Sequence, residues 1–365
     1  MKIKAAVLYE NQTTFNVEEV DLAEPQAGEI LVKIAGTGIC HADLDIASGA
    51  VAIPRPVVLG HEGAGVVAET GTEVTGLQAG DHVVLTGNAA CGKCQYCVRG
   101  MPYLCEIFRP LLHKGTVANR QRRLSRNGEY INHSFMQSSF AEYAVVPQEA
   151  AVKIRRDTPL DIMGFLGCSG ITGMGSVVNT ARVRAGSSVA IFGCGSVGMN
   201  VLLASVLVGA ASIIAVDLSD SKLAIAGETG ATHTVNPARE NSTKHIKQLT
   251  GGGADYTFAA VGSADAIAQA FDATRPGGIC VVIGGSPETS QLTFNGGSLL
   301  QERTIRGCRY GSSVASRDIP AYIDLFMSGK LPLDRLVTGR FPLAEINAAF
   351  SAVAAGEGIK TVIIP

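Results

Sequence analysis

The sequence predicts an α/β protein built around a doubly wound parallel sheet. Three observations predict this class. Short apolar runs of strand type alternate with helical patterns from residue 188 onward, which is typical of a parallel sheet covered by helices. The first of these strands runs directly into a glycine-rich turn and a helix. A cluster of four cysteines precedes this region and indicates a metal-binding lobe in the first half of the chain.

The glycine-rich turn lies between a strand over 188–192 and a helix over 199–208, and a second strand follows over 212–216. Glycines allow a tight turn and a close approach of the backbone to a pyrophosphate, and the helix N-terminus offers it free N–H groups. Strand, G-x-G-x-x-G, helix, strand and acid in this order predict a dinucleotide site. Its candidate residues are Gly193, Gly195, Ser196, Val197, Gly198 and Asp217.

Asp217 indicates which of the two nicotinamide dinucleotides the site prefers. It ends the second strand, where a carboxylate accepts hydrogen bonds from the hydroxyls of the adenosine ribose. A carboxylate there would repel a 2′-phosphate, so NAD(H) is favoured over NADP(H). Lys222 would lie near the same ribose and softens this preference.

Three further runs of strand type, over 255–261, 278–283 and 303–307, extend the predicted sheet, and a helix is expected over 264–274. Cys280 and Cys308 lie in or beside these strands and are expected to be small core residues. Cys194 lies within the glycine turn, where only a small side chain fits.

The four cysteines of the first half are Cys91, Cys94, Cys97 and Cys105. Four thiolates can close a tetrahedron around Zn²⁺ with no open position, as in a structural site. The alternative is disulfide pairing in an exported protein, which needs an oxidising compartment. The N-terminal stretch has no apolar segment long enough for a signal peptide. We therefore expect a structural zinc lobe over residues 91–105 and a reducing, cytoplasmic location.

Charge argues against a zinc-containing nucleic-acid-binding module. Lys plus Arg total 30 and Asp plus Glu total 32, a net charge of −2, which leaves no overall electrostatic footprint for a phosphate backbone. A local basic run over 119–126 is either a solvated loop or a patch for an anionic substrate or a partner. No stretch reaches about 18 uninterrupted apolar residues, so we expect no membrane span.

Three more candidate ligands are scattered along the chain: Cys40, His61 and Cys168. Two thiolates and one imidazole form a three-ligand zinc site with an open fourth position, which is the arrangement of a catalytic metal. Spacing alone does not join residues this far apart. Taken singly, each is better explained as a core cysteine or a hydrogen-bonded histidine.

The order of these motifs resembles the zinc-dependent alcohol dehydrogenases of the medium-chain dehydrogenase/reductase superfamily. The resemblance covers essentially the whole chain. The long segment between Cys105 and Cys168 is similar to the vertebrate-type branch, which includes the glutathione-dependent (class III-like) formaldehyde dehydrogenases. The segments that carry it are Cys40-His41, Gly60-His61-Glu62-Gly63-x-Gly65-x-Val67, the four-cysteine cluster, Cys168, the turn from Gly193 to Gly198, and Ile359-Lys360-Thr361-Val362-Ile363.

The resemblance implies two domains. Residues 1–169 and 313–365 would form a GroES-like, β-rich catalytic domain, and residues 170–312 a Rossmann domain that binds NAD. The active site would lie in the cleft between the two domains. Edge pairing of the cofactor-domain sheets near residues 299–310 would form a homodimer.

The resemblance also implies a catalytic metal. Cys40, His61 and Cys168 would bind it, and Glu62 would be a nearby carboxylate that can approach it, so that each chain would hold two zinc ions. Zinc would polarise the oxygen of a small-molecule alcohol or aldehyde, and the nicotinamide would carry the hydride.

Three further residues would contact the cofactor in such an enzyme. His41 and Lys360 would face its pyrophosphate, and Thr172 would lie by the nicotinamide.

The chain departs from the family where the alcohol proton is expected to leave. Family members usually carry Ser or Thr two residues after the first zinc ligand, and many have His at the position of Asp45. Here the first position is Ala42, which has no hydrogen-bonding side chain. Three consequences are open: a water that passes the proton toward Asp45 or His41, conjugate reduction of an activated alkene, or a lyase step.

The expected pocket favours a bulky substrate. Many members place an aromatic wall ahead of the structural zinc, whereas this chain has Gly87-Asn88, which opens volume beside the metal. This predicts an aromatic or terpenoid alcohol or its aldehyde. Phe135 and Met136 either line this pocket or pack in the core.

Two alternatives remain. Arg109 matches an arginine of the glutathione-dependent members, but Val51 and Ala42 replace the residues that accompany it, which weighs against a glutathione adduct. The other alternative is a non-enzymatic, zinc-stabilised NAD-binding protein. The retention of an open three-ligand set argues against it, because nothing structural requires such a set.

Overall fold

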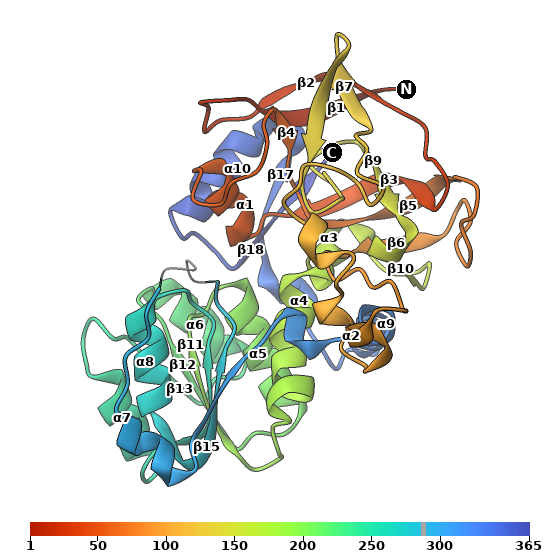
Figure 1. The fold of residues 1–365 in the computed structure, drawn as a ribbon. Helices are drawn as coiled ribbons and strands as arrows, with labels where there is room; N and C mark the ends of the chain where they lie inside the picture. Colours follow the sequence, from red (N-terminus) through yellow and green to blue (C-terminus); the bar gives the residue numbers. More distant parts are fainter. Residues whose placement is uncertain (286–289) are drawn as a thin grey trace. The chain divides into compact units, whose positions relative to one another are not determined.

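The computed structural model describes residues 1–285 and 290–365 (Figure 1). The chain divides into two compact units. The first comprises Met1–Cys168, Val314–Gly329 and Leu333–Pro365, and the second comprises Ser169–Ser313 and Lys330–Pro332. Among the described residues, no single helix is both long and apolar enough to cross a membrane.

The first unit is rich in β-structure and contains a closed barrel and a larger sheet. The barrel has the order β1-β2-β7-β8-β4, with β1 Lys2–Leu8, β2 Asn16–Leu22, β7 Leu124–Arg126, β8 Glu129–His133 and β4 Val57–Val58. The sheet has the order β10-β6-β5-β3-β18-β17, and β9 pairs with β3. Its strands are β10 Ala151–Ile154, β6 His82–Leu85, β5 Glu62–Thr70, β3 Glu29–Gly38, β18 Lys360–Ile364, β17 Val337–Pro342 and β9 Tyr143–Pro147.

Strand β3 shows why these segments form a sheet. Ile30, Val32 and Ile34 alternate along it, are buried, and pack in one apolar cluster with Val67 and Val83 of the neighbouring strands. β-branched residues at a period of two fit a pleated surface with one buried face. The pairing of β3 with β5 shifts register twice, between Leu31 and Val32 and between Ile34 and Gly36. It ends with Gly38 opposite Glu62, next to the candidate ligands.

Short helices connect and cover these strands. They are α1 His41–Ala47, η3 Gln148–Ala150, α3 Leu160–Met163, η4 Gly164–Gly167, α9 Ala315–Met327, η8 Leu333–Leu336, η9 Leu343–Glu345 and α10 Ile346–Ala354. An excursion between β6 and β7 carries α2 Gln95–Val98, η1 Pro102–Leu104 and η2 Arg109–Leu111. This excursion holds the four-cysteine cluster.

The second unit is a parallel sheet with helices on both faces (Figure 1). Its order is β13-β12-β11-β14-β15-β16, with β13 His233–Val235, β12 Ser212–Val216, β11 Ser188–Phe192, β14 Ala254–Ala259, β15 Thr274–Val282 and β16 Thr304–Gly307. Its helices are α4 Ser169–Gly175, the π-helix η5 Ser176–Ala181, α5 Ser196–Leu207, α6 Asp220–Thr229, α7 Ser242–Leu249, α8 Ala264–Asp272, η6 Gly296–Gln301 and η7 Tyr310–Ser312. The strand order reverses beside β11, which is the switch point where such sheets bind ligands.

The predicted α/β class with a doubly wound sheet is confirmed. The strands over 188–192 and 212–216 have the predicted bounds. Strand β15 begins at Thr274, where the helix over 264–274 was expected to end, and the helix stops at Asp272. The edge strand β13 and helices α6 and α7 were not predicted. β13 is short and largely exposed, so it shows no apolar run.

Candidate active site and metal centres

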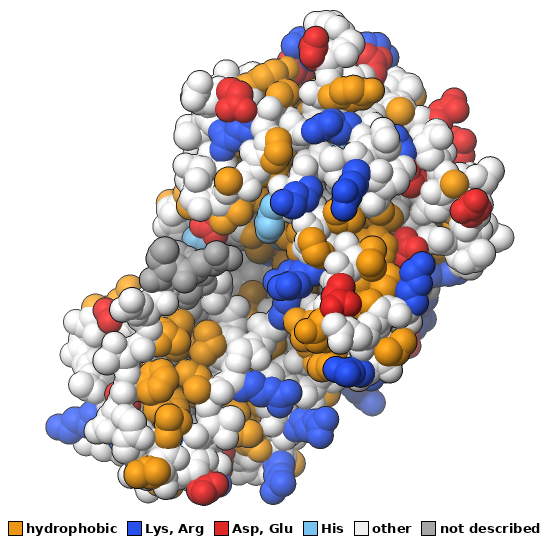
Figure 2. Space-filling view, viewed as in Figure 1, with side chains coloured by type: hydrophobic (Ala, Val, Ile, Leu, Met, Phe, Trp, Pro, Cys, Tyr) orange, Lys and Arg blue, Asp and Glu red, His pale blue; other side chains and the backbone are white. Residues whose placement is uncertain are grey.

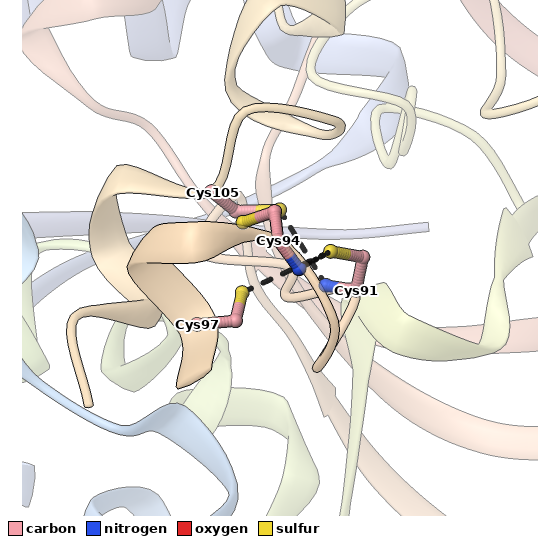
Figure 3. A group of neighbouring side chains, drawn as sticks. All are labelled: Cys91, Cys94, Cys97 and Cys105. Atoms are coloured by element: carbon pink, nitrogen blue, oxygen red, sulfur yellow. Dashed lines mark hydrogen bonds between the residues drawn. The ribbon is translucent and has the colours of Figure 1, made fainter. Parts of the chain in front are cut away.

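The four cysteines of the excursion lie together (Figure 3). The sulfur atoms of Cys91, Cys94, Cys97 and Cys105 all lie within 4.8 Å of one another. Cys94 caps the N-terminus of α2, and its backbone N–H donates to the Cys91 sulfur at 3.3 Å. The backbone N–H of Cys91 donates to the Cys105 sulfur at 3.5 Å. The thiolate is the form of cysteine that binds a metal.

The thiols of this cluster differ in acidity. Backbone N–H groups, first that of Cys97, lower the pKa of Cys94 to about 6. Burial, followed by the hydrogen bond with Cys94, raises the pKa of Cys97 to about 12. All four donors are sulfur and the cluster offers no other ligand among the described residues. A closed, all-sulfur set of this kind suits structural zinc.

The second cluster collects residues from three distant segments. The ligand atoms of Cys40, His61 and Cys168 all lie within 4.8 Å of one another. Gly38, at the end of β3, pairs with Glu62, at the start of β5, so the residues that follow and precede these positions come together. Cys168 arrives directly after η4.

Two glycines allow η4 to lie against the sheet. A Cβ atom at Gly164 would collide with the carbonyl oxygen of Glu62, and one at Gly167 with that of Leu85. The hydroxyl of Thr86 donates to the carbonyl oxygen of Gly167 at 2.6 Å. Close backbone approach, which requires glycine, therefore brings Cys168 to the other two ligands.

Asp43 organises this second cluster. Its carboxylate lies 3.1 Å from Nδ1 of His61 and accepts the backbone N–H groups of Cys40 at 3.0 Å and Gly60 at 3.3 Å. Burial is the largest single influence and would lower the pKa of His61, but the charges and hydrogen bonds of Asp43 and Cys40 together outweigh it, and the net shift is upward. With Nδ1–H held by a carboxylate, Nε2 carries the free lone pair.

The Nε2 atom of His61 is buried and has no hydrogen-bond partner. A buried polar atom without a partner is rare and needs an explanation. Here two sulfur atoms face the same space, and the hydrogen bond between the thiols lowers the pKa of Cys40 and raises that of Cys168. Two sulfurs and one oriented imidazole fit a zinc ion with an open fourth position.

Glu62 and Lys360 form a buried ion pair beside this cluster. The Nζ atom of Lys360 donates to Oε2 of Glu62 at 2.6 Å and to the carbonyl oxygen of Ile39 at 2.9 Å. Burial raises the pKa of Glu62. For Lys360, burial is the largest single influence and opposes the charged form, but Glu62, Cys40 and Cys168 together outweigh it and the pKa is raised. Lys360, which is predicted to face the pyrophosphate of the cofactor, thus lies beside Glu62.

The residues of the expected proton route lie on α1. The side chain of His41 is 83% exposed, and its Nε2 lies 3.6 Å from Oδ1 of Asp45. Ala42 lies between them in sequence and contributes only a methyl group. The pair is accessible to solvent and is joined by an i,i+4 contact on one helix face.

A ring stack covers the second cluster. The rings of Phe135 and His61 lie 4.1 Å apart with an interplanar angle of 16°, and His113 meets the edge of Phe135 at 4.9 Å. Met136 is fully buried next to Phe135. The sequence predicts that the pocket is open at Gly87-Asn88. In the structure Asn88 is buried, and its backbone N–H donates to the hydroxyl of Thr86.

The predicted dinucleotide turn joins β11 to α5. Gly193 adopts a φ of +99°, and Gly195 is the N-cap of α5. A Cβ atom at Gly198 would collide with the carbonyl oxygen of Gly193. Ser196 and Val197 form the first turn of α5, so their N–H groups point toward the end where an anion would bind.

Asp217 follows β12 next to this turn. Its carboxylate accepts the N–H of Cys194 at 2.6 Å and the N–H of Ser219 at 2.9 Å. These two bonds fix the acid beside the glycine turn. Lys222 lies in the first turn of α6, and its backbone N–H donates to the hydroxyl of the N-cap residue Ser219 at 3.4 Å. Thr172 lies on α4 of the same unit.

Sequence reasoning missed Asp43 and His113. Asp43 had only a weak local signal: it lies three residues after Cys40, the spacing of a capping box, which the structure forms at the start of α1. His113 had none, since its contact with Phe135 depends on two loops that meet only in the folded chain.

Two family models match the chain. The alcohol dehydrogenase GroES-like domain matches residues 26–156, and the zinc-binding dehydrogenase model matches residues 196–328. The fold and the site therefore define a zinc-binding dehydrogenase with a GroES-like domain and a Rossmann-type domain.

Relatives match along the full chain. An S-(hydroxymethyl)glutathione dehydrogenase from Paracoccus denitrificans is 37% identical over 376 residues, which is 100% of both chains. Two solved structures each cover 100% of this chain and 99% of their own: an alcohol dehydrogenase zinc-binding domain protein from Burkholderia ambifaria (40% identity, TM-score 0.96) and benzyl alcohol dehydrogenase from Acinetobacter calcoaceticus (36% identity, TM-score 0.95). The chain belongs to the zinc-dependent alcohol dehydrogenases of the medium-chain dehydrogenase/reductase superfamily, and it is an oxidoreductase.

Proposed function

We propose that the protein transfers a hydride between NAD(H) and a bulky primary or secondary alcohol or its carbonyl product, with catalytic zinc at Cys40, His61 and Cys168. The unpartnered, buried Nε2 of His61 facing two sulfur atoms is the observation that carries this proposal. Zinc bound there would act as a Lewis acid on the substrate oxygen. We propose a second, structural zinc at the four-cysteine cluster.

The protein's own residues would prepare the reaction. Asp43 orients His61 and raises its basicity as a ligand. Lys360 gives one N–H donor to Glu62, which it neutralises, and one to the carbonyl oxygen of Ile39. Its third donor would remain for a cofactor pyrophosphate. Phe135 and Met136 would exclude water from the reacting atoms, which strengthens every charge interaction there.

The proposed proton route differs from the family pattern at its first step, at Ala42. Because Ala42 offers no hydroxyl, we propose that a water carries the alcohol proton to Asp45, whose carboxylate lies within 3.6 Å of the exposed His41. Asp45→Asn should then lower alcohol turnover at neutral pH, and Ala42→Thr should restore part of it. If neither change altered turnover, this route would be wrong. Conjugate alkene reduction or a lyase step would then become the stronger proposal.

Asp217 supports the choice of NAD(H). Its carboxylate is fixed at the end of β12 by two N–H groups, where it would accept hydrogen bonds from ribose hydroxyls and repel a 2′-phosphate. The ratio of kcat/KM for NAD⁺ over NADP⁺ should therefore fall in Asp217→Ala. An unchanged ratio would remove this support.

The experiment that tests the proposed reaction follows NADH absorbance with zinc-loaded protein and a panel of small, aromatic and terpenoid alcohols. We expect higher kcat/KM for benzyl-type and long-chain alcohols than for ethanol, and loss of turnover when the metal is removed. The 36% identity to a benzyl alcohol dehydrogenase supports this substrate class. A higher kcat/KM for ethanol would contradict the prediction of a wide pocket. The absence of turnover with every alcohol of the panel would contradict the proposed reaction.

A glutathione adduct is the second candidate substrate. Arg109 and Lys114 are exposed on either side of His113 in the sequence, and the described residues provide no ion-pair partner for either. Lys and Arg side chains also gather near a histidine on the visible face of the first unit (Figure 2). The 37% identity to an S-(hydroxymethyl)glutathione dehydrogenase supports this alternative. Direct competition between S-(hydroxymethyl)glutathione and benzyl alcohol, repeated with Arg109→Ala, separates the two.

We further propose a homodimer in a reducing, cytoplasmic compartment. β16 is the edge of its sheet, and the exposed Leu299 and Leu300 precede it, so an exposed strand edge needs cover. All nine cysteines are free, which supports a reducing location. Light scattering on Leu300→Lys tests the dimer, because a charge at this edge should produce monomers.

A further inference from the structure

We propose that His133 is a positioning residue for the metal site: as the Nδ1–H tautomer it holds the loop over 134–138 so that the ring of Phe135 lies on His61. The proposal rests on the proposed function, because it assigns the loop to the wall of the catalytic metal site. It goes beyond that function by naming a residue that touches neither metal nor substrate and still sets the shape of the site.

The loop has an unusual backbone. Phe135, Met136 and Ser138 adopt left-handed φ values of 52°, 60° and 57°. Bulky residues rarely adopt this conformation, and none of these three is glycine or asparagine. Such a loop persists only where surrounding contacts hold it.

His133 supplies one of these contacts. Its Nε2 accepts the backbone N–H of Arg123 at 3.0 Å, so the proton of the neutral ring must be on Nδ1. Nδ1 lies 3.1 Å from Oγ of Ser138, and that oxygen also accepts the N–H of Ser134 at 3.2 Å. The ring therefore bridges a fixed backbone segment to both ends of the loop.

The segment on the other side of His133 is firmly anchored. Arg123 is buried and makes a bidentate ion pair with Glu29, at 2.8 Å from Nε and 3.0 Å from Nη2. The backbone N–H of His133 donates to the carbonyl oxygen of Gly115 at 3.0 Å. Burial, with the nearby charges of Arg123 and Arg122, lowers the pKa of His133 to about 3, so the ring stays neutral where the enzyme would work.

The segment after the loop is tied to the two residues that precede His61. The N–H of Ser139 donates to the carbonyl oxygen of Gly60, and that of Phe140 to Leu59, each at 3.0 Å. The N–H of Phe135 donates to the carbonyl oxygen of Leu112 at 2.9 Å. With both ends fixed, the His133–Ser138 contact decides where the loop between them puts the ring of Phe135, which stacks on His61.

The loop offers a matched pair of serines as a test. The hydroxyl of Ser138 bonds to His133, whereas the hydroxyl of Ser134 is buried and has no partner. Ser138→Ala should therefore change the ratio of kcat/KM for benzyl alcohol over ethanol by about tenfold or more, as removal of groups that orient ligands does. Ser134→Ala should leave that ratio unchanged. Equal behaviour of the two variants would overturn the proposal.

Two substitutions of His133 test its two hydrogen bonds separately. The amide nitrogen of Asn can replace Nδ1–H toward Ser138, whereas the amide oxygen of Gln can replace Nε2 toward the Arg123 N–H. We expect His133→Asn to keep most of the substrate selectivity and His133→Gln to lose it. A purely structural role would lower thermal stability in both variants without separating their selectivities, and that result would contradict the proposal.

A spectroscopic measurement on the wild-type protein keeps the proposal testable if the variants fold poorly or if the proposed reaction is wrong. Nitrogen-15 histidine labelling reports the tautomer of each of the seven histidines. We expect His133 to be an Nδ1–H tautomer, in addition to His61, and we expect the ring of His133 to remain unprotonated from pH 8 to pH 5. Protonation of His133 in this range, or an Nε2–H tautomer, would overturn the proposal whatever the activity assay shows.

Discussion

The two cysteine clusters of this protein are built in opposite ways. The four-cysteine cluster comes from one excursion, in which a short helix and tight turns bring local thiols together. The three-ligand cluster draws Cys40, His61 and Cys168 from the ends of a strand, a second strand and a helical turn. The first cluster is encoded by spacing, and the second by strand register and by glycines that permit close packing. We therefore expect the local cluster to depend on a bound metal for its shape, and the second cluster to be held by the scaffold around it.

Loss of a ligand from the scaffold-held cluster should have the largest effect on activity. In Cys168→Ser the hydroxyl is a poor zinc ligand, and kcat/KM for the preferred alcohol should fall by more than about 1,000-fold, because several kcal/mol of Lewis-acid stabilisation are lost at about 1.4 kcal/mol per tenfold. Thermal unfolding should change little. Cys280→Ser, which alters a buried thiol outside both clusters, is the matched control and should stay active.

Loss of a ligand from the local cluster should act on stability instead. We expect Cys97→Ser to lose the metal that stabilises the fold of the lobe. Each kcal/mol of unfolding free energy that is lost should lower Tm by about 2–4 °C in a domain of this size. Calorimetry and limited trypsin digestion, which cuts at exposed Lys93 or Arg99 in the lobe, measure the effect. An unchanged Tm together with a protease-resistant lobe would show that the lobe does not depend on its metal.

The contact between Asp43 and His61 tests how far the scaffold holds the second cluster. Asp43→Asn keeps the volume but removes the charge that orients the imidazole. Zinc affinity or activity should fall by about 10- to 100-fold, as is typical when the partner of a metal-bound histidine is changed. Competition with a chelator measures the zinc affinity. Wild-type affinity in this variant would mean that Cys40 and Cys168 hold the metal without an oriented histidine.

Acid should weaken the wall of the second cluster through His133. Its pKa of about 3 in the folded chain lies below the value of 6.5 for the unfolded chain, so the unfolded state takes up a proton first and stability falls as pH decreases below 6.5. Linkage gives a loss of about 2 kcal/mol at pH 5. Urea unfolding at pH 7 and pH 5 should show this difference in wild type and a smaller one in His133→Asn. Equal differences in both proteins would remove His133 as the cause.

The contrast between the clusters also explains what the sequence could predict. The four cysteines, the glycine turn with Asp217 and the neighbouring strands are local patterns, and each lies where its pattern indicates. Cys40, His61 and Cys168 could be joined only through resemblance to a family, because nothing in their spacing shows that Gly38 pairs with Glu62.

The stack of Phe135 on His61 lay beyond any local pattern. It depends on left-handed φ values at Phe135 and Met136, and side chains of this size normally indicate an ordinary strand or helix. The hydrogen bonds of His133 that hold the loop come from residues ten positions earlier and five positions later. Such a network forms only when the barrel is closed, so it becomes visible only in the folded protein.

Zinc stoichiometry by native mass spectrometry tests the central claim that the chain holds one closed and one open zinc site. We predict two zinc ions per chain in the wild-type protein and one in each of Cys168→Ser and Cys97→Ser, with the single ion of Cys97→Ser retained at the cluster of His61. One zinc ion in the wild-type protein, or two in Cys168→Ser, would contradict the account.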